Sequence, residues 1–245
     1  MCQNSNLYQM ENLHDRVTVV IKTFIRYQTL RRTIRRIKSV WPGLHIIVVD
    51  DTPLKLRKPI AIPGVTFVVT EPDIGLSAGR NRGFAEASTE YVLYTDDDAF
   101  PHASSSLADL EHLVKQLDAG LADLIGWRGW TINENGGRLS FRGVRPGDLT
   151  VCQVTENAYI ARRAVLVQNP HPEEIKINGE HFSFFYLLYK AKVKVRCSKL
   201  LRFINTKARN PEYTAYRNRT YRKAAKRATG YQGALWQAPS ADSGS

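Results

Sequence analysis

The sequence predicts an α/β fold with a mostly parallel sheet and helices on both faces. Apolar runs rich in β-branched residues alternate with segments in which apolar residues recur every three or four positions. The first pattern is typical of buried strands and the second of amphipathic helices. Two of the predicted strands end directly in aspartates. Ligands of α/β proteins bind at the carboxyl ends of the strands, so these aspartates are expected to line a site.

The first half of the chain shows the alternation most clearly. Strands are expected in VTVVIKTF (17–24), HIIVVD (45–50), VTFVVTE (65–71) and EYVLYTD (90–96). A helix is expected before Pro42-Gly43, with one apolar face made of Leu30, Ile34, Ile37 and Trp41. The glycine-rich GLSAGRNRG is predicted to be a turn that leads into a second helix, and SLADLEHLVKQLDAG to be a third.

The second half is less regular. Short strands are expected around the Asn-Gly-Gly turn within residues 126–143, and a strand that runs into a turn over 154–165. The aromatic-rich EHFSFFYLLYKAK is a predicted helix, followed by a strand over 193–206. Residues 210–230 form a basic helix candidate, and residues 236–245 are expected to be disordered. Nothing divides the chain convincingly, so one domain over 1–235 is expected.

The net charge of +12 predicts an anionic partner, such as a nucleic acid, a phosphorylated substrate or an acidic lipid. Much of the excess lies between Tyr186 and Tyr231, where 14 Lys and Arg residues accompany a single acid, Glu212. Three widely separated cysteines without a CxxC pair argue against a zinc site or a disulfide framework. The polar N-terminus does not resemble a signal peptide, and no apolar run approaches the roughly 20 residues of a membrane span. A cytoplasmic protein is therefore expected.

Three consecutive aspartates, Asp96 to Asp98, end the fourth predicted strand. Side chains alternate along a strand, so Asp96 and Asp98 are expected on one face and Asp97 on the other. This D-x-D spacing suits Mg²⁺ or Mn²⁺, which one or two protein carboxylates hold together with substrate phosphates. The alternative is an acidic turn or a helix N-cap. The buried strand before the triplet, and Asp50-Asp51 at a second strand end, favour the metal.

Three further segments are candidates for binding or catalysis. Arg80 in GLSAGRNRG suits a phosphate or a base, although a helix start with an arginine ion pair explains it as well. Glu180 is a candidate general base, or else an exposed carboxylate in a first helical turn. His181 is either catalytic or a core histidine. The tail NPEYTAYRNRTYRKAAKR suits nucleic acid, diphosphate or an anionic membrane, or is a solvated basic helix.

Taken in order, these motifs resemble one known family. The segments KTFxRYxxLRRxI, VxDD, GxxAGRN and YVLxxDDDxxF, followed by GEHFSFF, are similar to the GT-A inverting glycosyltransferases of family 2. The likeness is greater to the branch with the ganglioside N-acetylgalactosaminyltransferases. It covers residues 17–119 well and the segment around Glu180 more loosely. It implies a GT-A fold, with a nucleotide-binding half at 17–125, an acceptor half at 126–209 and a basic tail helix at 210–231.

The resemblance also implies a nucleotide-sugar site. Thr23 would lie near the nucleotide, and Asp50 would bind its base, most often uracil in this family. Arg80 and Asn81 would hold the nucleotide side of the crevice, and Asp97 would belong to the same site. The donor implied is a UDP-sugar.

A metal and a base complete the implied site. Asp98 would ligate the Mn²⁺ or Mg²⁺ that bridges the diphosphate, and Asp96 would lie beside the ribose and the metal. Glu180 would be the base for attack by an acceptor hydroxyl in a single displacement with inversion. Two departures matter: Ser183 stands where relatives commonly have a carboxylate, and Asn205 where many have a metal-supporting histidine.

The implied role is glycan or polysaccharide biosynthesis, with a glycan or another hydroxyl compound as acceptor. The basic tail would help to hold the donor diphosphate, an anionic acceptor or the inner face of a membrane. Two alternatives stay open. A sugar nucleotidyltransferase usually carries a GxGTR-like loop, which KTFIRYQT is not. A basic nucleic-acid-binding protein would explain the net charge, but it gives no reason for aspartates at two strand ends.

Overall fold

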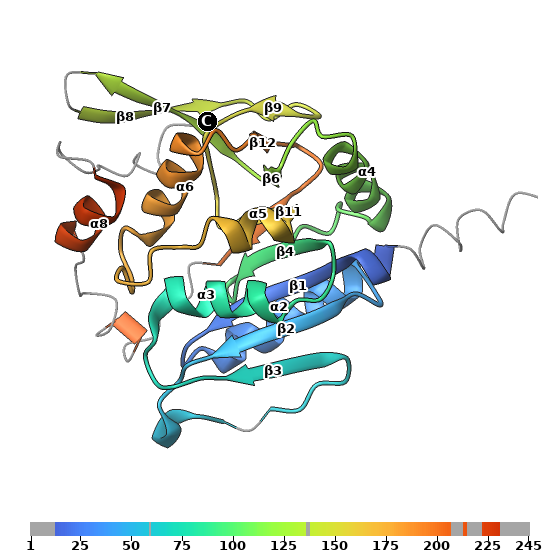
Figure 1. Cartoon of the computed structure of the whole chain (residues 1–245). Coiled ribbons are helices and arrows are strands. Elements are labelled where there is room, and N and C mark those ends of the chain that lie inside the picture. The colour runs from blue at the N-terminus through green and yellow to red at the C-terminus, as the bar shows by residue number, and fades with distance from the viewer. Residues whose placement is uncertain (1–12, 59, 136–137, 207–212, 215–221, 231–245) are drawn as a thin grey trace, which may run out of the picture.

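A computed structural model describes residues 13–58, 60–135, 138–206, 213–214 and 222–230 of the 245-residue chain. One eight-stranded sheet runs through it in the order β3-β2-β1-β4-β11-β6-β12-β9 (Figure 1). In chain order its strands are β1 (Val17–Thr23), β2 (His45–Asp50), β3 (Val65–Val69), β4 (Tyr91–Asp96), β6 (Leu124–Gly126), β9 (Thr150–Val151), β11 (Ala158–Arg162) and β12 (Val195–Cys197). The strands β3, β2, β1 and β4 are parallel to one another, whereas β11 runs antiparallel to β4 and β6. The predicted α/β class with a mostly parallel sheet is confirmed.

Two small sheets flank the large one. The first consists of β10 (Val154–Thr155), β7 (Gly129–Asn135) and β8 (Arg138–Val144), and the second pairs β13 (Phe203–Asn205) with β5 (Ala99–Pro101). The single strand predicted over 193–206 is therefore wrong, because the segment divides into β12 and β13. A turn separates them, in which the Ser198 hydroxyl accepts a hydrogen bond from the backbone N–H of Leu200.

The helices are α2 (Tyr27–Val40), α3 (Gly75–Glu86), α4 (Leu107–Asp118), α5 (Arg163–Gln168), α6 (Glu180–Lys190) and α8 (Arg222–Thr229), with a 3-10 turn η1 (Leu54–Leu56). The glycine-rich stretch predicted as a turn forms most of α3 itself. Small residues are needed there because α3 lies very close to β1. A Cβ atom added at Gly79 would lie 2.2 Å from Lys22 Cε, and one at Gly83 would lie 2.4 Å from Val20 Cγ1.

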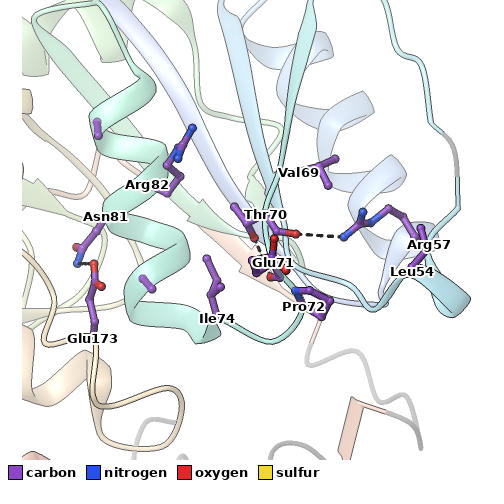
Figure 2. Close-up of a pocket in the computed structure, with 12 residues that line it drawn as sticks. Leu54, Arg57, Val69, Thr70, Glu71, Pro72, Ile74, Asn81, Arg82 and Glu173 are labelled. Carbon is purple, nitrogen blue, oxygen red and sulfur yellow. Dashed lines mark hydrogen bonds between the residues drawn. The ribbon is translucent and has the colours of Figure 1, made fainter.

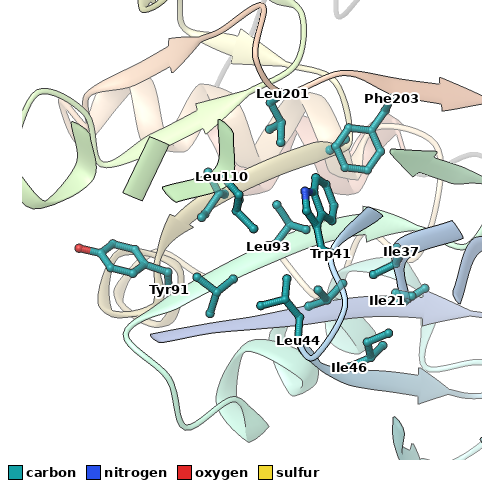
Figure 3. Packing of buried hydrophobic residues seen from close by; sticks show 14 of the residues in the cluster. Ile21, Ile37, Trp41, Leu44, Ile46, Tyr91, Leu93, Leu110, Leu201 and Phe203 are labelled. Atoms are coloured by element: carbon teal, nitrogen blue, oxygen red, sulfur yellow. The ribbon is translucent and has the colours of Figure 1, made fainter. Parts of the chain in front are cut away.

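The helices cover both faces of the sheet, as predicted. On one face α2 and α4 bury apolar side chains against β1, β2, β4 and β11. Figure 3 shows this layer around Trp41, whose ring lies 5.9 Å from that of Phe203. On the other face α3, α5 and α6 contribute Phe84, Leu166 and Phe184 among others. Alternate residues of β1 enter the two layers, which is the pattern of a strand buried on both sides.

The C-terminal helix α8 packs against α6 (Figure 1). Its Ala224 and Ala228 contact Ile175 in the segment before α6. Part of the predicted basic helix over 210–230 is thus present, while its residues 210–212 and 215–221 lie outside the described part of the chain, as do residues 236–245. Among the described helices, none has the length and hydropathy to cross a membrane.

Candidate active site

The carboxyl ends of three neighbouring strands bring predicted site residues to one edge of the sheet. Thr23 pairs with Asp50 across β1 and β2, and Lys22 pairs with Asp96 across β1 and β4. Asp50 is buried; its Oδ2 atom accepts a hydrogen bond from the Tyr27 hydroxyl at 2.7 Å, and its Oδ1 atom accepts one from the N–H of residue 52 at 2.9 Å. The parallel register therefore gathers the strand-end residues, as the sequence predicts.

The three aspartates do not alternate as a strand would require. β4 ends at Asp96, and Asp97 and Asp98 lie in the turn before β5. Both of these carboxylates bind Arg26, so Asp97 does not point away from Asp98. The expected alternation over residues 96–98 is therefore wrong, because the strand ends at Asp96, two residues before Asp98.

Arg26 is the main cation of this turn, and the sequence analysis did not identify it. Its Nη1 atom donates to Asp98 Oδ2 at 2.7 Å, and its Nη2 atom donates to Asp97 Oδ1. Asp97 Oδ2 also accepts a hydrogen bond from the Thr23 hydroxyl at 2.7 Å. Two signals were available: Arg26 is a fixed position of the motif KTFxRYxxLRRxI, and three adjacent aspartates need a cation nearby.

Arg80 connects two other candidate residues. Its side chain is fully buried on α3, where Nε donates to the Tyr94 hydroxyl at 2.7 Å and Nη2 donates to Asp96 Oδ1 at 3.3 Å. Its Nη1 atom lies 3.6 Å from Glu180 Oε1. These contacts match the ion-pair reading of Arg80, while its contact with a nucleotide stays a prediction. Tyr94, which donates to Asp96 at 2.6 Å, was also missed, although it lies two residues before Asp96 on the same strand.

Asn81 lies next to Arg80 but its amide group is bound to a different segment. Its Nδ2 atom donates to the carbonyl oxygen of His171 and to Glu173 Oε1, both at 2.9 Å. Figure 2 shows Asn81 and Glu173 on one side of a groove of about 960 Å³, with Arg57 and Thr70 on the other. None of the three aspartates, nor Glu180, lines this groove. The structure thus does not bring the Asn81 side chain together with the other candidates.

Glu180 is the first residue of α6 and is 6% exposed. The alternative of an exposed first-turn carboxylate therefore does not describe it. The chain enters α6 through Asn178 and Gly179, whose φ angles are 57° and 124°; such values favour glycine and asparagine. This tight entry directs the Glu180 carboxylate toward Arg80.

His181 has the contacts of a core histidine. Its ring packs edge-on against Phe185, with centroids 5.0 Å apart, and its Nδ1 atom hydrogen-bonds Asn157 Oδ1. Burial and the nearby Arg80 lower the pKa of His181 to about 4, so it is neutral at pH 7. Ser183, two residues on, is buried in α6, so the position where relatives commonly have a carboxylate lies inside the protein.

The carboxylates of the turn differ in their acidity. Burial raises the pKa of Asp97 to about 6 against the opposing effect of Arg26, and it raises the pKa of Asp98 as well. Burial alone would raise the pKa of Asp96 too, but Arg80 and the Tyr94 hydroxyl outweigh it and hold that pKa below its ordinary value. Asp96 is therefore the most acidic of the three.

Two carboxylate oxygens remain for a metal. Within the described ranges, no other residue donates a hydrogen bond to Asp96 Oδ2 or to Asp98 Oδ1. The side chains of Asp96 and Asp98 are 20% and 9% exposed. Together with Asp97 and Glu180, these carboxylates carry two more charges than Arg26 and Arg80, with which they pair. Two carboxylate ligands and this excess charge fit Mg²⁺ or Mn²⁺.

A third protein ligand is not evident. In the part of the chain that the structure describes, no group of three or more His, Cys, Asp and Glu side chains could hold a metal. Asn205, at the end of β13, pairs with Ala99, the residue after Asp98. The N–H and hydroxyl of Thr206 both donate to the Asp98 carbonyl oxygen. Asn205 thus lies in the strand that pairs with the residues after the aspartates.

Comparison with known sequences places the chain among transferases. A sequence profile described as Glycosyl transferase family 2 matches residues 18–163. The β-1,4 N-acetylgalactosaminyltransferase 1 of Rattus norvegicus is 36% identical over 115 residues, which make up 47% of this chain and 21% of that protein. The Homo sapiens protein of the same name is 33% identical over 115 residues. The chain thus matches about a fifth of the length of these curated relatives.

Solved structures share the fold. The S. aureus TarS fragment 1–349 in complex with UDP-GlcNAc has a TM-score of 0.57 and 18% identity, over 82% of this chain and 61% of that one. The same fragment with UDP has a TM-score of 0.53 and 16% identity, over 77% of this chain and 59% of that one. This likeness agrees with the predicted GT-A architecture.

Proposed function

The chain belongs to glycosyl transferase family 2, and on that premise we propose that it transfers a sugar from a nucleoside-diphosphate donor to an acceptor hydroxyl. One observation carries the proposal beyond family membership: Asp50 and Asp96 end β2 and β4, the strands on either side of β1, Asp98 follows in the next turn, and Arg80 joins Asp96 to Glu180 at the start of α6. The donor is proposed to be a UDP-sugar, because TarS, which shares the fold, was solved with UDP-GlcNAc and with UDP.

Each residue has a proposed role in a single displacement with inversion. Asp50 binds the base of the nucleotide, and Thr23 lies beside the nucleotide. Glu180 takes the proton of the acceptor hydroxyl as the oxygen attacks the anomeric carbon. The bond from that carbon to the diphosphate breaks on the opposite side, and the nucleoside diphosphate leaves. Arg80 orients the Glu180 carboxylate.

Asp96 and Asp98 are proposed to hold a divalent cation, Mn²⁺ or Mg²⁺, through the two oxygens that other described residues leave unoccupied. When bound, such a cation neutralises the charge that develops on the leaving diphosphate. Asp97 stays with Thr23 and Arg26 and fixes the shape of the turn.

The acceptor is proposed to be a glycan or another hydroxyl compound. The basic C-terminal segment, which includes Arg227 on α8, would contact an anionic acceptor, the donor diphosphate or an anionic membrane face. Family membership favours this transferase over a sugar nucleotidyltransferase and over a nucleic-acid-binding protein.

The test is donor turnover. The protein is incubated with a panel of UDP-sugars and Mn²⁺, and release of UDP is measured with and without glycan acceptors. We expect slow release with one donor, which chelation of the metal abolishes. Asp98→Asn should lose donor binding, whereas Glu180→Gln should bind donor but lose transfer by about a hundredfold or more. The exposed Asp148→Asn and Glu174→Gln are matched controls. No turnover, and no metal-dependent donor binding with any nucleotide sugar, would contradict the proposal.

A further inference from the structure

Arg26 occupies a position that the proposed donor site does not explain. The side chain is buried, and its guanidinium group lies between Asp97 and Asp98. Besides the two bonds from its Nη atoms, Nε donates to Asp97 Oδ2 at 3.3 Å. One cation thus pairs with two aspartates of the turn from which the proposed metal draws its ligands, and offsets one of their two charges.

The local structure is unfavourable for an arginine here. Arg26 is the N-cap residue of α2 and makes no side-chain cap. A helix N-terminus carries partial positive charge, so a cation has the wrong sign, and Ser, Thr, Asp and Asn are the usual N-cap residues. The preceding Ile25 has a φ angle of 66°, which β-branched residues rarely adopt. An uncommon backbone therefore delivers this side chain to the aspartates, which indicates a role other than starting the helix.

The surroundings fix Asp97 more firmly than Asp98. The Asp97 carboxylate accepts bonds from Arg26 and Thr23, and its carbonyl oxygen accepts one from the Thr33 hydroxyl at 2.8 Å. The carbonyl oxygen of Asp98 is likewise held, by Thr206, but its carboxylate accepts a bond from one other described residue only, Arg26. The Tyr213 ring covers the guanidinium, with its centroid 4.3 Å from Arg26 Cζ. Asp97 is thus the fixed partner of Arg26, and Asp98 is the partner that can be shared.

We propose that Arg26 acts as a built-in counter-ion of the donor site, so that a divalent cation binds tightly only together with a nucleoside diphosphate. This inference rests on the proposed function. In the protein without ligand, a cation would meet Asp96, an Asp98 that is already paired, and the positive charge of Arg26. A nucleoside diphosphate supplies oxygen ligands and negative charge, which offset the repulsion from Arg26. Arg26 is therefore a positioning residue that couples the two binding events.

The experiment measures Mn²⁺ affinity of the full chain by calorimetry, without nucleotide and with saturating UDP. For the wild type we expect weak Mn²⁺ binding in the absence of nucleotide. With UDP the Mn²⁺ affinity should rise about tenfold or more, which is a usual size for the coupling between two binding sites. Arg26→Met should bind Mn²⁺ alone about tenfold more tightly than the wild type, because repulsion is lost, and UDP should then strengthen Mn²⁺ binding less than it does in the wild type. A gain of affinity is the decisive readout, since a merely structural Arg26 would lose affinity on substitution.

Companion variants separate charge from structure. Arg26→Lys keeps the charge, so its Mn²⁺ affinity without nucleotide should stay weak. Arg26→Gln removes the charge with less loss of volume and decides the question if Arg26→Met does not fold. The exposed Arg31→Met removes a charge from the same helix and should change nothing. Unchanged Mn²⁺ affinity in folded Arg26→Met or Arg26→Gln, with UDP-dependent binding intact in the wild type, overturns this inference alone. No metal binding by any protein, with or without UDP, overturns the proposed metal site as well.

Discussion

Two histidines, His171 and His181, are close enough to Arg80 for its charge to act on them. His171 stacks on Phe184 with ring centroids 3.8 Å apart, and His181 packs against Phe185 on the same helix. Burial lowers the pKa of both, and Arg80 adds to the effect. The folded protein thus holds both rings neutral, because a second and third cation beside Arg80 would be repelled.

This arrangement makes stability depend on pH. Between about pH 6.5 and about pH 4 an unfolded histidine binds a proton that folded His181 does not. The free energy of unfolding is therefore highest, as far as His181 is concerned, above pH 6.5, and it falls as the pH falls through this range. At pH 5 the loss from His181 is about 2 kcal/mol. The raised pKa of Asp97 changes the free energy of unfolding in the opposite direction over this pH range. The effect of His181 is therefore measured as the difference in pH dependence between a His181 variant and the wild type.

We therefore expect His181→Gln to reduce the loss of unfolding free energy between pH 7 and pH 5 by about 2 kcal/mol relative to the wild type. The measurement is denaturant unfolding at both pH values. The exposed His112→Gln serves as the control and should keep the wild-type dependence. Equal pH dependence in wild type and His181→Gln would show that this ring is protonated in the fold at pH 5.

At the scale of elements, a buried ion pair ties α3 to the ends of β1 and β2. Lys22 pairs with Asp51, and both side chains are 1% exposed. Asp51 Oδ2 also accepts the backbone N–H of Gly75 at 3.0 Å, where α3 begins. The aliphatic part of Lys22 lies against Gly79, so the helix can approach the pair only because position 79 has no side chain.

Gly79→Ala should destabilise the protein by about 2 kcal/mol, although helix propensity alone would favour alanine by up to about 1 kcal/mol. The new Cβ displaces Lys22, and Asp51 loses a buried partner. A double-mutant cycle checks the cause by denaturant unfolding: in a Lys22→Ala background the same change should be neutral or stabilising, because the methyl group then fills vacated space. An equal cost in both backgrounds would place the clash elsewhere.

The elements were predictable where a local pattern determines them. The periods of β1, β2, β4, α2 and α4 are visible in the residues themselves. What failed depended on contacts between distant segments. The turn predicted at GLSAGRNRG is helical because glycines let α3 pack on β1, and residues 193–206 divide because β13 pairs with β5. The partners of the site residues, Arg26 for Asp98 and Arg80 for Glu180, are likewise set by tertiary structure.

At the scale of the whole molecule, one sheet joins the two halves of the chain. β11 lies between β4 from the first half and β6 from the second, and both apolar layers take residues from both halves. The far end of the sheet carries Cys152 and Cys197, which are buried in the same layer. Trp41 lies in the opposite layer and belongs to the first half. The thiols therefore report on the far end of the sheet, while Trp41 reports on the first half and on its contact with Phe203.

We expect the two halves to unfold together, because separation would expose both apolar layers. In a variant with Trp127, Trp130 and Trp236 replaced by Phe, Trp41 fluorescence is followed in denaturant. A brief pulse of thiol reagent at each concentration, read by peptide mass spectrometry, measures exposure of Cys152 and Cys197. The two transitions should share one midpoint. Labelling of either thiol at denaturant concentrations where Trp41 fluorescence is still native would instead show that the end of the sheet with Cys152 and Cys197 opens by itself and that the single-domain expectation is wrong.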